Sequence, residues 1–525
     1  MASNKKQFAV TLEQRFDVTI PFKLLILRSK KGKLTLSVQW FTWTGFKRSL
    51  FYTFLMPSCT LFFKSDPLKI IEASGQYMYN EHGQAYLDCI NNVCHVGHCH
   101  PAVVEAGCKQ MHKLNTNSRF LHDNMVLLAK RLVETMPPEL CMVYFVNSGS
   151  EANDLALRLA RHHTKGSEII TLERAYHGHV LSLIDLSTYK LNHINDGMHV
   201  RPDFVHIAEC PDTYRGKYRN TDHPMEQMAD LYVGSVDDII SKIEAADKQV
   251  SCFIAESMQS CGGQILYPEG YLSKVFRSVR AAGGVCIADE VQVGFGRVGT
   301  HMWSFDAQGC LPDIVTIGKP MGNGHPLAAV VTTREIAASF AACGIEYFNT
   351  YGGNPVSCAI GLAVLDVIKN DKLMENASKV GKVLEAKLNE LKVKHQIIGD
   401  VRGVGMFWGL DLVKDRTSRD PATDEAYYVV KRAKEECVLL SRDGPHENVI
   451  KFKAPMCFTV ENAGTLVKLL DLLLTEISDG KMAAPAHHKV TNGADTNHSE
   501  PVCKKLKPNG TPSHAVEGHL NGQPA

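Results

Sequence analysis

One lysine, Lys319, stands in a setting that suits amine chemistry. It follows the apolar run Ile314–Ile317 and lies between Gly318 and Pro320, in the stretch DIVTIGKPMGNG. A lysine delivered by a buried strand into such a loop either extends its ammonium group to water or is kept for its amine. Burial disfavours the charged form, and the neutral amine is a nucleophile towards aldehydes.

Four other apolar runs also end in polar residues. NSGSEAND follows Val146, ERAYHGH follows Leu172, ESMQSCGG follows Ala255 and DEVQVGFGR follows Ala288. In open α/β sheets, ligands collect at the carboxyl ends of the strands. The five segments together therefore predict one site at one edge of a sheet.

The segment NSGSEAND can bind an anion. It places Gly149 and Ser150 at the expected start of a helix, where free amide groups attract negative charge. The alternative is an ordinary serine N-cap without a ligand.

The remaining segments complete a recognisable set. Asp289 either caps the segment that follows it or pairs with a cationic ring nitrogen, and Gln292 offers both a donor and an acceptor. Tyr176 and His177 offer a flat face on which a ring can stack. With a phosphate cradle at Gly149 and Ser150 and an amine at Lys319, these groups predict pyridoxal 5′-phosphate as the cofactor.

The elements that must position these residues alternate between strand and helix. Helical patterns such as 150–163 and 271–282 separate short apolar runs, which predicts an α/β fold with a mostly parallel sheet covered on both faces. From about residue 364 a long helical pattern leads into a smaller α+β unit. The predicted strands are 142–146, 169–172, 204–208, 252–255, 285–288 and 314–317.

The order of the motifs NSGSEAN, AYHGH, ADEVQVGFGR, GKPMGNGHP and NTYGGNP resembles the class-III pyridoxal-phosphate aminotransferases of fold type I, from about residue 57 to 477. The resemblance implies two domains with the cofactor between them, and a homodimer or homotetramer with a shared active site.

By matching motif, the resemblance also implies roles for individual residues. Lys319 holds the cofactor as a Schiff base and is the catalytic residue, and Asp289 pairs with the ring nitrogen. Gly149 and Ser150 bind the cofactor phosphate. The other cofactor contacts implied are Tyr176, which stacks on the ring, His177 beside it, Gln292 near the ring hydroxyl, Glu256 as the acidic group beside the site, and Thr350, which reaches the neighbouring subunit's cofactor.

Within the family, CINNVCHVGHCHP, LNTNSRFLHDN, PDTYRGKYR and AESMQSCGGQI are similar to the phospho-lyase branch, which removes phosphate from phosphoethanolamine or 5-phosphohydroxy-L-lysine. Phosphoethanolamine is the favoured substrate, with phosphate, acetaldehyde and ammonia as products. Arg119 and Arg215 lie in these stretches and are candidates for binding the substrate phosphate, or are surface or structural residues. The alternatives are an ω-aminotransferase that uses the same lysine and, least favoured, a catalytically silent binding protein.

Composition sets the remaining expectations. The chain of 525 residues is 44% hydrophobic and 22% charged, with a net charge of +1, which gives no basis for nucleic-acid or membrane binding. Histidines and cysteines within CHVGHCHP lack tetrahedral metal-site spacing, so no metal is expected. The predicted segments are a basic extension at 1–64 with an insert at about 16–56, a joining segment at 65–104, a cofactor domain at 105–355, a small domain at 356–478 and a disordered tail at 479–525.

The segment 18–65 contains no Asp or Glu. An acid-poor N-terminal region is typical of mitochondrial import, and the family resemblance implies the same compartment. The insert at about 16–56 makes up most of this acid-poor segment and obscures the import signal, so the cytoplasm remains the alternative.

Overall fold

The computed structural model describes residues 22–30, 33–41, 59–64, 66–191 and 201–482. The chain divides into two compact units, Met1–Lys69 and Ile70–Ala525. In the first unit, β1 (Phe22–Lys30) and β2 (Lys33–Phe41) form an antiparallel hairpin inside the predicted insert. The rest of the insert lies outside the described residues, as does 483–525 of the predicted disordered tail.

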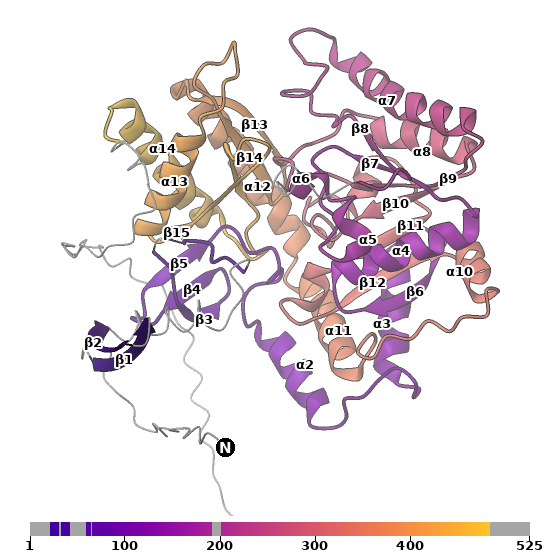
Figure 1. Cartoon of the computed structure of the whole chain (residues 1–525), viewed down its shortest axis with the longest axis horizontal. Coiled ribbons are helices and arrows are strands. Elements are labelled where there is room, and N and C mark those ends of the chain that lie inside the picture. The colour runs from indigo at the N-terminus through magenta and orange to yellow at the C-terminus, as the bar shows by residue number, and fades with distance from the viewer. Residues whose placement is uncertain (1–21, 31–32, 42–58, 65, 192–200, 483–525) are drawn as a thin grey trace, which may run out of the picture. The chain divides into compact units, whose positions relative to one another are not determined.

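A seven-stranded sheet forms the centre of the second unit, with the strand order β6-β12-β11-β10-β9-β7-β8 (Figure 1). Only β12 runs against the others, since it pairs antiparallel with both β11 and β6. The strands are β6 (Leu140–Val146), β7 (Glu168–Leu172), β8 (Val205–Ala208), β9 (Val250–Glu256), β10 (Val285–Asp289), β11 (Ile314–Ile317) and β12 (Ala328–Thr333). The predicted fold class is confirmed.

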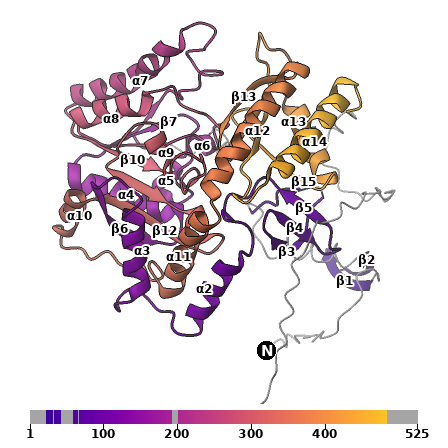
Figure 2. The same ribbon diagram turned by 180° about the vertical axis from the view of Figure 1, so that it is seen from behind.

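Helices cover both faces of this sheet because the strands are apolar on both sides. On one face, Ile254, Ile287 and Ile314 pack with Leu155 of α4 in one buried cluster. On the other face, Phe253 meets Phe276 of α8 (Tyr271–Ala281) edge to face, with the ring centroids 6.3 Å apart, within the range of about 4.5 to 7 Å that aromatic pairs prefer. Two layers of helices therefore enclose the sheet (Figures 1 and 2).

The helices of this region match the predicted periodicity. The predicted helices 150–163 and 271–282 correspond to α4 and α8 within one residue at each end. The helices are α2 (Pro101–Met111), α3 (Asp123–Val133), α4 (Gly149–Thr164), α5 (Leu181–Ile184), α6 (Thr188–Leu191), α7 (Met225–Ala245), α8 (Tyr271–Ala281), α9 (Ser304–Ala307), the 3-10 helix η1 (Lys319–Gly322), α10 (Arg334–Ala341) and α11 (Pro355–Asn370).

The C-terminal region is a smaller α+β arrangement, as predicted. Its sheet has the order β13-β14-β17-β16, and β15 pairs with β5 in a second sheet, β15-β5-β4-β3. The N-terminal strands of this unit thus contact the C-terminal region, while the predicted domain boundaries stay a prediction. The elements are β3 (Ile70–Ser74), β4 (Tyr77–Asn80), β5 (Ala85–Asp88), α12 (Leu373–Lys394), β13 (Ile398–Val404), β14 (Phe407–Leu412), α13 (Thr423–Glu435), β15 (Val438–Leu439), β16 (Ser441–Asp443), β17 (Val449–Phe452) and α14 (Val460–Ser478).

None of the helices in the described ranges is long and apolar enough to cross a membrane.

Candidate active site

A cavity of about 350 Å³ lies at the carboxyl ends of the central strands. Seven of the predicted site residues line it: Gly149, Ser150, Tyr176, His177, Asp289, Gln292 and Lys319. They come from the ends of β6, β7, β10 and β11, so the sheet brings together segments up to 170 positions apart, from Gly149 to Lys319.

Lys319 is the first residue of η1, directly after β11 and Gly318. A Cβ atom at Gly318 would lie 3.1 Å from Val291 Cγ1 and 3.3 Å from Gly149 Cα, so a glycine lets the lysine loop approach α4 closely. The Lys319 amine makes no hydrogen bond or ion pair with any residue in the described part of the chain. Burial lowers the pKa of Lys319, against the opposing influence of Cys261 and Asp289.

Asp289 is held in place by neighbouring donors. Its Oδ2 atom accepts hydrogen bonds from His177 Nδ1 and Asn153 Nδ2, both at 2.8 Å, and its Oδ1 atom accepts one from the Val291 amide at 3.1 Å. The carboxylate is 2% exposed. These contacts fix its orientation, which suits it to face a cationic nitrogen in the cavity.

The start of α4 combines both sequence interpretations. Ser148 is the N-cap, since its side chain accepts a hydrogen bond from the Glu151 amide at 3.2 Å. Gly149 and Ser150 are the first helical residues and line the cavity. The first amide groups of a helix have no partner within it, so they are available to an anion.

Asn153 was missed by the sequence interpretation. It lies one helical turn after Gly149, at the i+4 position, so the two face the same side of α4. Its Nδ2 atom bonds Asp289 and the His177 carbonyl. The helical spacing within NSGSEAND was the signal that could have found it.

The remaining polar atoms fit the predicted cofactor. Asn153 Oδ1 and His177 Nε2 are buried without a partner, although both residues line the cavity. A lysine amine, an anchored carboxylate, an aromatic side chain at Tyr176 and a helix N-terminus surround one cavity. This donor set matches the aldehyde, ring nitrogen, ring face and phosphate of pyridoxal phosphate.

Glu256 and Thr350 do not line the cavity. Glu256 is fully buried behind Tyr176, whose amide lies 3.4 Å from Glu256 Oε1. Burial, followed by the charge of Asp289, raises the pKa of Glu256 to about 7. Thr350 is exposed on the surface, so its predicted contact with a neighbouring subunit's cofactor stays a prediction.

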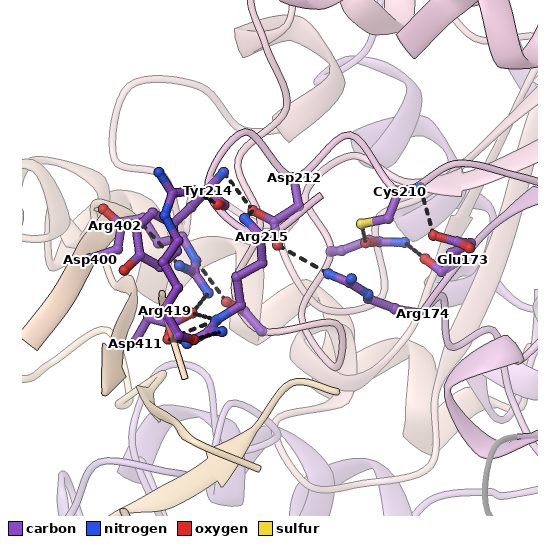
Figure 3. A network of polar contacts seen from close by, with 12 residues as sticks. Glu173, Arg174, Cys210, Asp212, Tyr214, Arg215, Asp400, Arg402, Asp411 and Arg419 are labelled. Atoms are coloured by element: carbon purple, nitrogen blue, oxygen red, sulfur yellow. Dashed lines mark hydrogen bonds and ion pairs between the residues drawn. The ribbon is translucent and has the colours of Figure 1, made fainter. Parts of the chain in front are cut away.

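The structure does not bring Arg119 or Arg215 to the cavity. Arg119 is exposed, pairs with Glu346 at 3.3 Å and lies over the Phe348 ring at 4.3 Å. Arg215 is buried in a polar network, where Nη2 and Nε bond Asp411 at 2.6 and 2.8 Å (Figure 3). In this geometry Asp411 is the partner of Arg215, and a role of either arginine in substrate binding stays a prediction.

In the CHVGHCHP segment, His95 and His98 make hydrogen bonds and an ion pair with protein groups. His95 Nε2 donates to the Phe295 carbonyl at 2.7 Å while Nδ1 accepts from Arg297 at 3.0 Å, and His98 pairs with Asp88 at 2.7 Å. No group of three or more His, Cys, Asp or Glu side chains that could hold a metal occurs among the described residues.

The fold and this site define a pyridoxal-phosphate enzyme of fold type I. The chain matches the family Aminotransferase class-III over residues 63–474 and belongs to it.

Relatives with different names are similar to the chain. A Drosophila melanogaster protein named Alanine--glyoxylate aminotransferase 2-like is 52% identical over 86% of this chain and 91% of its own. A Caenorhabditis elegans protein named Ethanolamine-phosphate phospho-lyase homolog 1 is 46% identical over 79% of this chain and 90% of its own. The structure of a phospholyase from Arthrobacter in complex with phosphoethanolamine is 37% identical, with a TM-score of 0.76, and covers 82% of this chain and 99% of its own.

Proposed function

We propose that this chain is a lyase that eliminates phosphate from phosphoethanolamine and yields acetaldehyde, ammonia and phosphate. The observation that carries the proposal is the similarity to the Arthrobacter phospholyase, whose structure contains phosphoethanolamine. The name of the Caenorhabditis elegans relative supports the same activity.

The residues of the cavity can perform this chemistry. Pyridoxal phosphate, when bound, makes the Cα proton of an amine substrate acidic and accepts the electrons left behind. The Lys319 amine, whose pKa burial lowers, removes that proton as a general base. Asp289 would pair with the protonated ring nitrogen, while His177 and Asn153 hold Asp289 in place. Phosphate then leaves from the adjacent carbon, and water hydrolyses the unsaturated amine that remains to acetaldehyde and ammonia.

The cofactor roles follow from the arrangement. Gly149 and Ser150 would hold the cofactor phosphate at the N-terminus of α4, and Tyr176 would lie against the ring. Gln292 would face the ring hydroxyl. Thr350 would complete the site of a neighbouring subunit, in a homodimer or homotetramer.

The decisive experiment supplies purified protein with phosphoethanolamine and no keto acid. Catalytic release of phosphate and acetaldehyde is expected, and a parallel reaction with 5-phosphohydroxy-L-lysine tests the second substrate. A Lys319→Ala variant should lose the visible absorbance of bound cofactor and slow phosphate release by about 10²- to 10⁴-fold. Turnover only in the presence of a keto acid would contradict the lyase.

An ω-aminotransferase is the second candidate. The Drosophila melanogaster relative, named as an aminotransferase, favours it. Both activities begin with the same proton removal by Lys319, so the assay without keto acid separates them.

We also propose a mitochondrial location, with the cytoplasm as the alternative. The absence of Asp and Glu from 18–65 supports import. Fusion of residues 1–69 to a fluorescent protein tests it, and a diffuse cytoplasmic signal would contradict it.

A further inference from the structure

A phosphorylated amine brings a second phosphate into a site that already has to hold the phosphate of the cofactor. That second phosphate needs its own cations. Arg119 and Arg215 are engaged elsewhere, with Glu346 and Asp411. Other cationic side chains near the cavity are therefore candidates for binding it.

Two lysines of the C-terminal region, Lys451 and Lys453, interact electrostatically with Lys319. Lys451 acts to lower the pKa of Lys319 further, after burial. Burial lowers the pKa of Lys453, and the ammonium groups of Lys451 and Lys319 lower it further. Mutual influence of this kind is typical of amines that lie in one poorly solvated region.

The strand β17 explains why these two lysines act together. Lys451 lies within β17 and Lys453 directly follows it. Residues two positions apart in an extended chain project to the same side. Lys451 pairs with Gly409 of β14 and with Ser441 of β16, so it lies on the middle strand of three.

Lys453 connects to the cavity through Gln292. Its Nζ atom donates to Gln292 Oε1 at 2.8 Å and to Ser260 Oγ at 2.6 Å. Gln292 lines the cavity. Lys453 is only 4% exposed, and no carboxylate within the described residues lies in ion-pair distance of it.

Lys451 has one carboxylate partner, Asp443. The fully buried Glu256 is the other carboxyl group that acts on Lys451, and its pKa of about 7 means that it carries only part of a charge at neutral pH. Lys451 and Lys453 therefore have little more than one negative charge close to them, and an added anion would favour the charged form of Lys453, whose pKa burial lowers. Buried cations short of counter-charge are costly unless an anion joins them.

We propose that Lys451 and Lys453 bind the phosphate group of the substrate, at a site separate from the cofactor phosphate site at the N-terminus of α4. The inference rests on the proposed function, because it assigns a position to the substrate's own phosphate. A lysine ammonium is a compact point charge that suits phosphate. The two lysines thereby select phosphorylated amines over unphosphorylated ones.

The test compares Lys451→Met and Lys453→Met holoenzymes with the wild type. The Michaelis constant for phosphoethanolamine and the inhibition constant for inorganic phosphate should each rise about 10- to 100-fold. Affinity for ethanolamine, followed by the spectrum of the bound cofactor, should change by less than about twofold. Lys451→Arg should restore part of the loss.

Lys274→Met is the matched control, since Lys274 of α8 forms an exposed ion pair with Asp230 of α7. It should leave every constant unchanged. Unchanged constants in both Lys451→Met and Lys453→Met, or an equal loss for ethanolamine, would overturn the inference. If Lys453→Met does not fold, Lys451→Met and Lys453→Arg decide the question.

Failure of the proposed function gives a different result. A wild type that releases no phosphate from phosphoethanolamine refutes the lyase. The anion site is then judged by calorimetry of inorganic phosphate with the holoenzyme. Binding that both methionine variants lose would support the site, and a wild type that binds no phosphate would overturn it.

Discussion

At the scale of single residues, Glu256 is a buried carboxyl group next to Tyr176, and it titrates near neutral pH. Its pKa of about 7 lies above the ordinary value of 4.5, because of burial and then Asp289. Between these two pH values the folded protein keeps a proton that the unfolded chain has released. The free energy of unfolding therefore falls as the pH rises through this window.

A Glu256→Gln variant should lose this dependence. The fall in the free energy of unfolding between pH 5 and pH 8 should shrink by up to about 3 kcal/mol. Urea unfolding of protein stripped of cofactor measures it. Glu244→Gln, at an exposed position of α7, is the control. A variant with the pH slope of the wild type would contradict the role of Glu256.

At the scale of elements, the start of α4 depends on a close approach. A Cβ atom at Gly149 would lie 2.8 Å from Val291 Cγ1 and 3.0 Å from Cγ2. Gly149→Ala should therefore move α4 or Val291, cost about 1–3 kcal/mol and weaken cofactor binding. Adding Val291→Ala should recover part of the affinity.

Gly464→Ala in α14 is the control for this substitution. Nothing lies within 4 Å of a Cβ atom at Gly464, so alanine should stabilise the helix by about 1 kcal/mol without changing cofactor affinity. Cofactor titration and thermal unfolding of both variants provide the measurement. Normal cofactor affinity in Gly149→Ala would contradict the close approach.

The loop between β8 and α7 depends on Arg215. Its contacts with Asp411 tie this loop to β14, and Asp411 also accepts hydrogen bonds from Arg402 and Asn448 (Figure 3). Arg215→Met removes a cationic partner of the fully buried Asp411 carboxylate. Its free energy of unfolding should drop by about 3 kcal/mol.

If Arg215 is structural, the Michaelis constant for phosphoethanolamine should stay within about twofold in Arg215→Met. Lys274→Met, which breaks an exposed ion pair, should cost less than about 1 kcal/mol. Chemical unfolding and steady-state kinetics measure both quantities. A large rise in the Michaelis constant with unchanged stability would restore Arg215 as a substrate residue.

The elements were easier to predict than the contacts between them. Six buried strands appear as short apolar runs in the sequence, and polar residues after four of them, β6, β7, β10 and β11, line the cavity. β12 was missed because its alanine-rich sequence, AAVVTT, lacks a strong apolar run. The partner of Arg215 lies 196 positions away, and Lys451 and Lys453 look like the solvent-facing residues of an alternating strand. Only the packing of β17 reveals their burial.

At the scale of the whole molecule, one surface of the second unit carries large exposed apolar side chains. Arg119 lies over the Phe348 ring, so the segments around these two residues are neighbours. Phe120 is 68% exposed, Leu121 is 87% exposed and Tyr351 is 69% exposed. Apolar surface gathered in this way is typical of protein interfaces, and Thr350 is the neighbour of Tyr351 in the chain.

A Leu121→Asp variant should therefore shift the protein from an oligomer to a monomer, because it places a charge in an apolar contact. Since Thr350 is proposed to serve the neighbouring subunit's cofactor, the monomer should also bind cofactor about 10-fold more weakly. Sedimentation and cofactor titration measure the two effects. Val393→Asp, at a position of α12 that is 80% exposed, should leave both unchanged. A wild type that is monomeric and binds cofactor fully would contradict the shared site, because Thr350 would then have no neighbouring cofactor to reach.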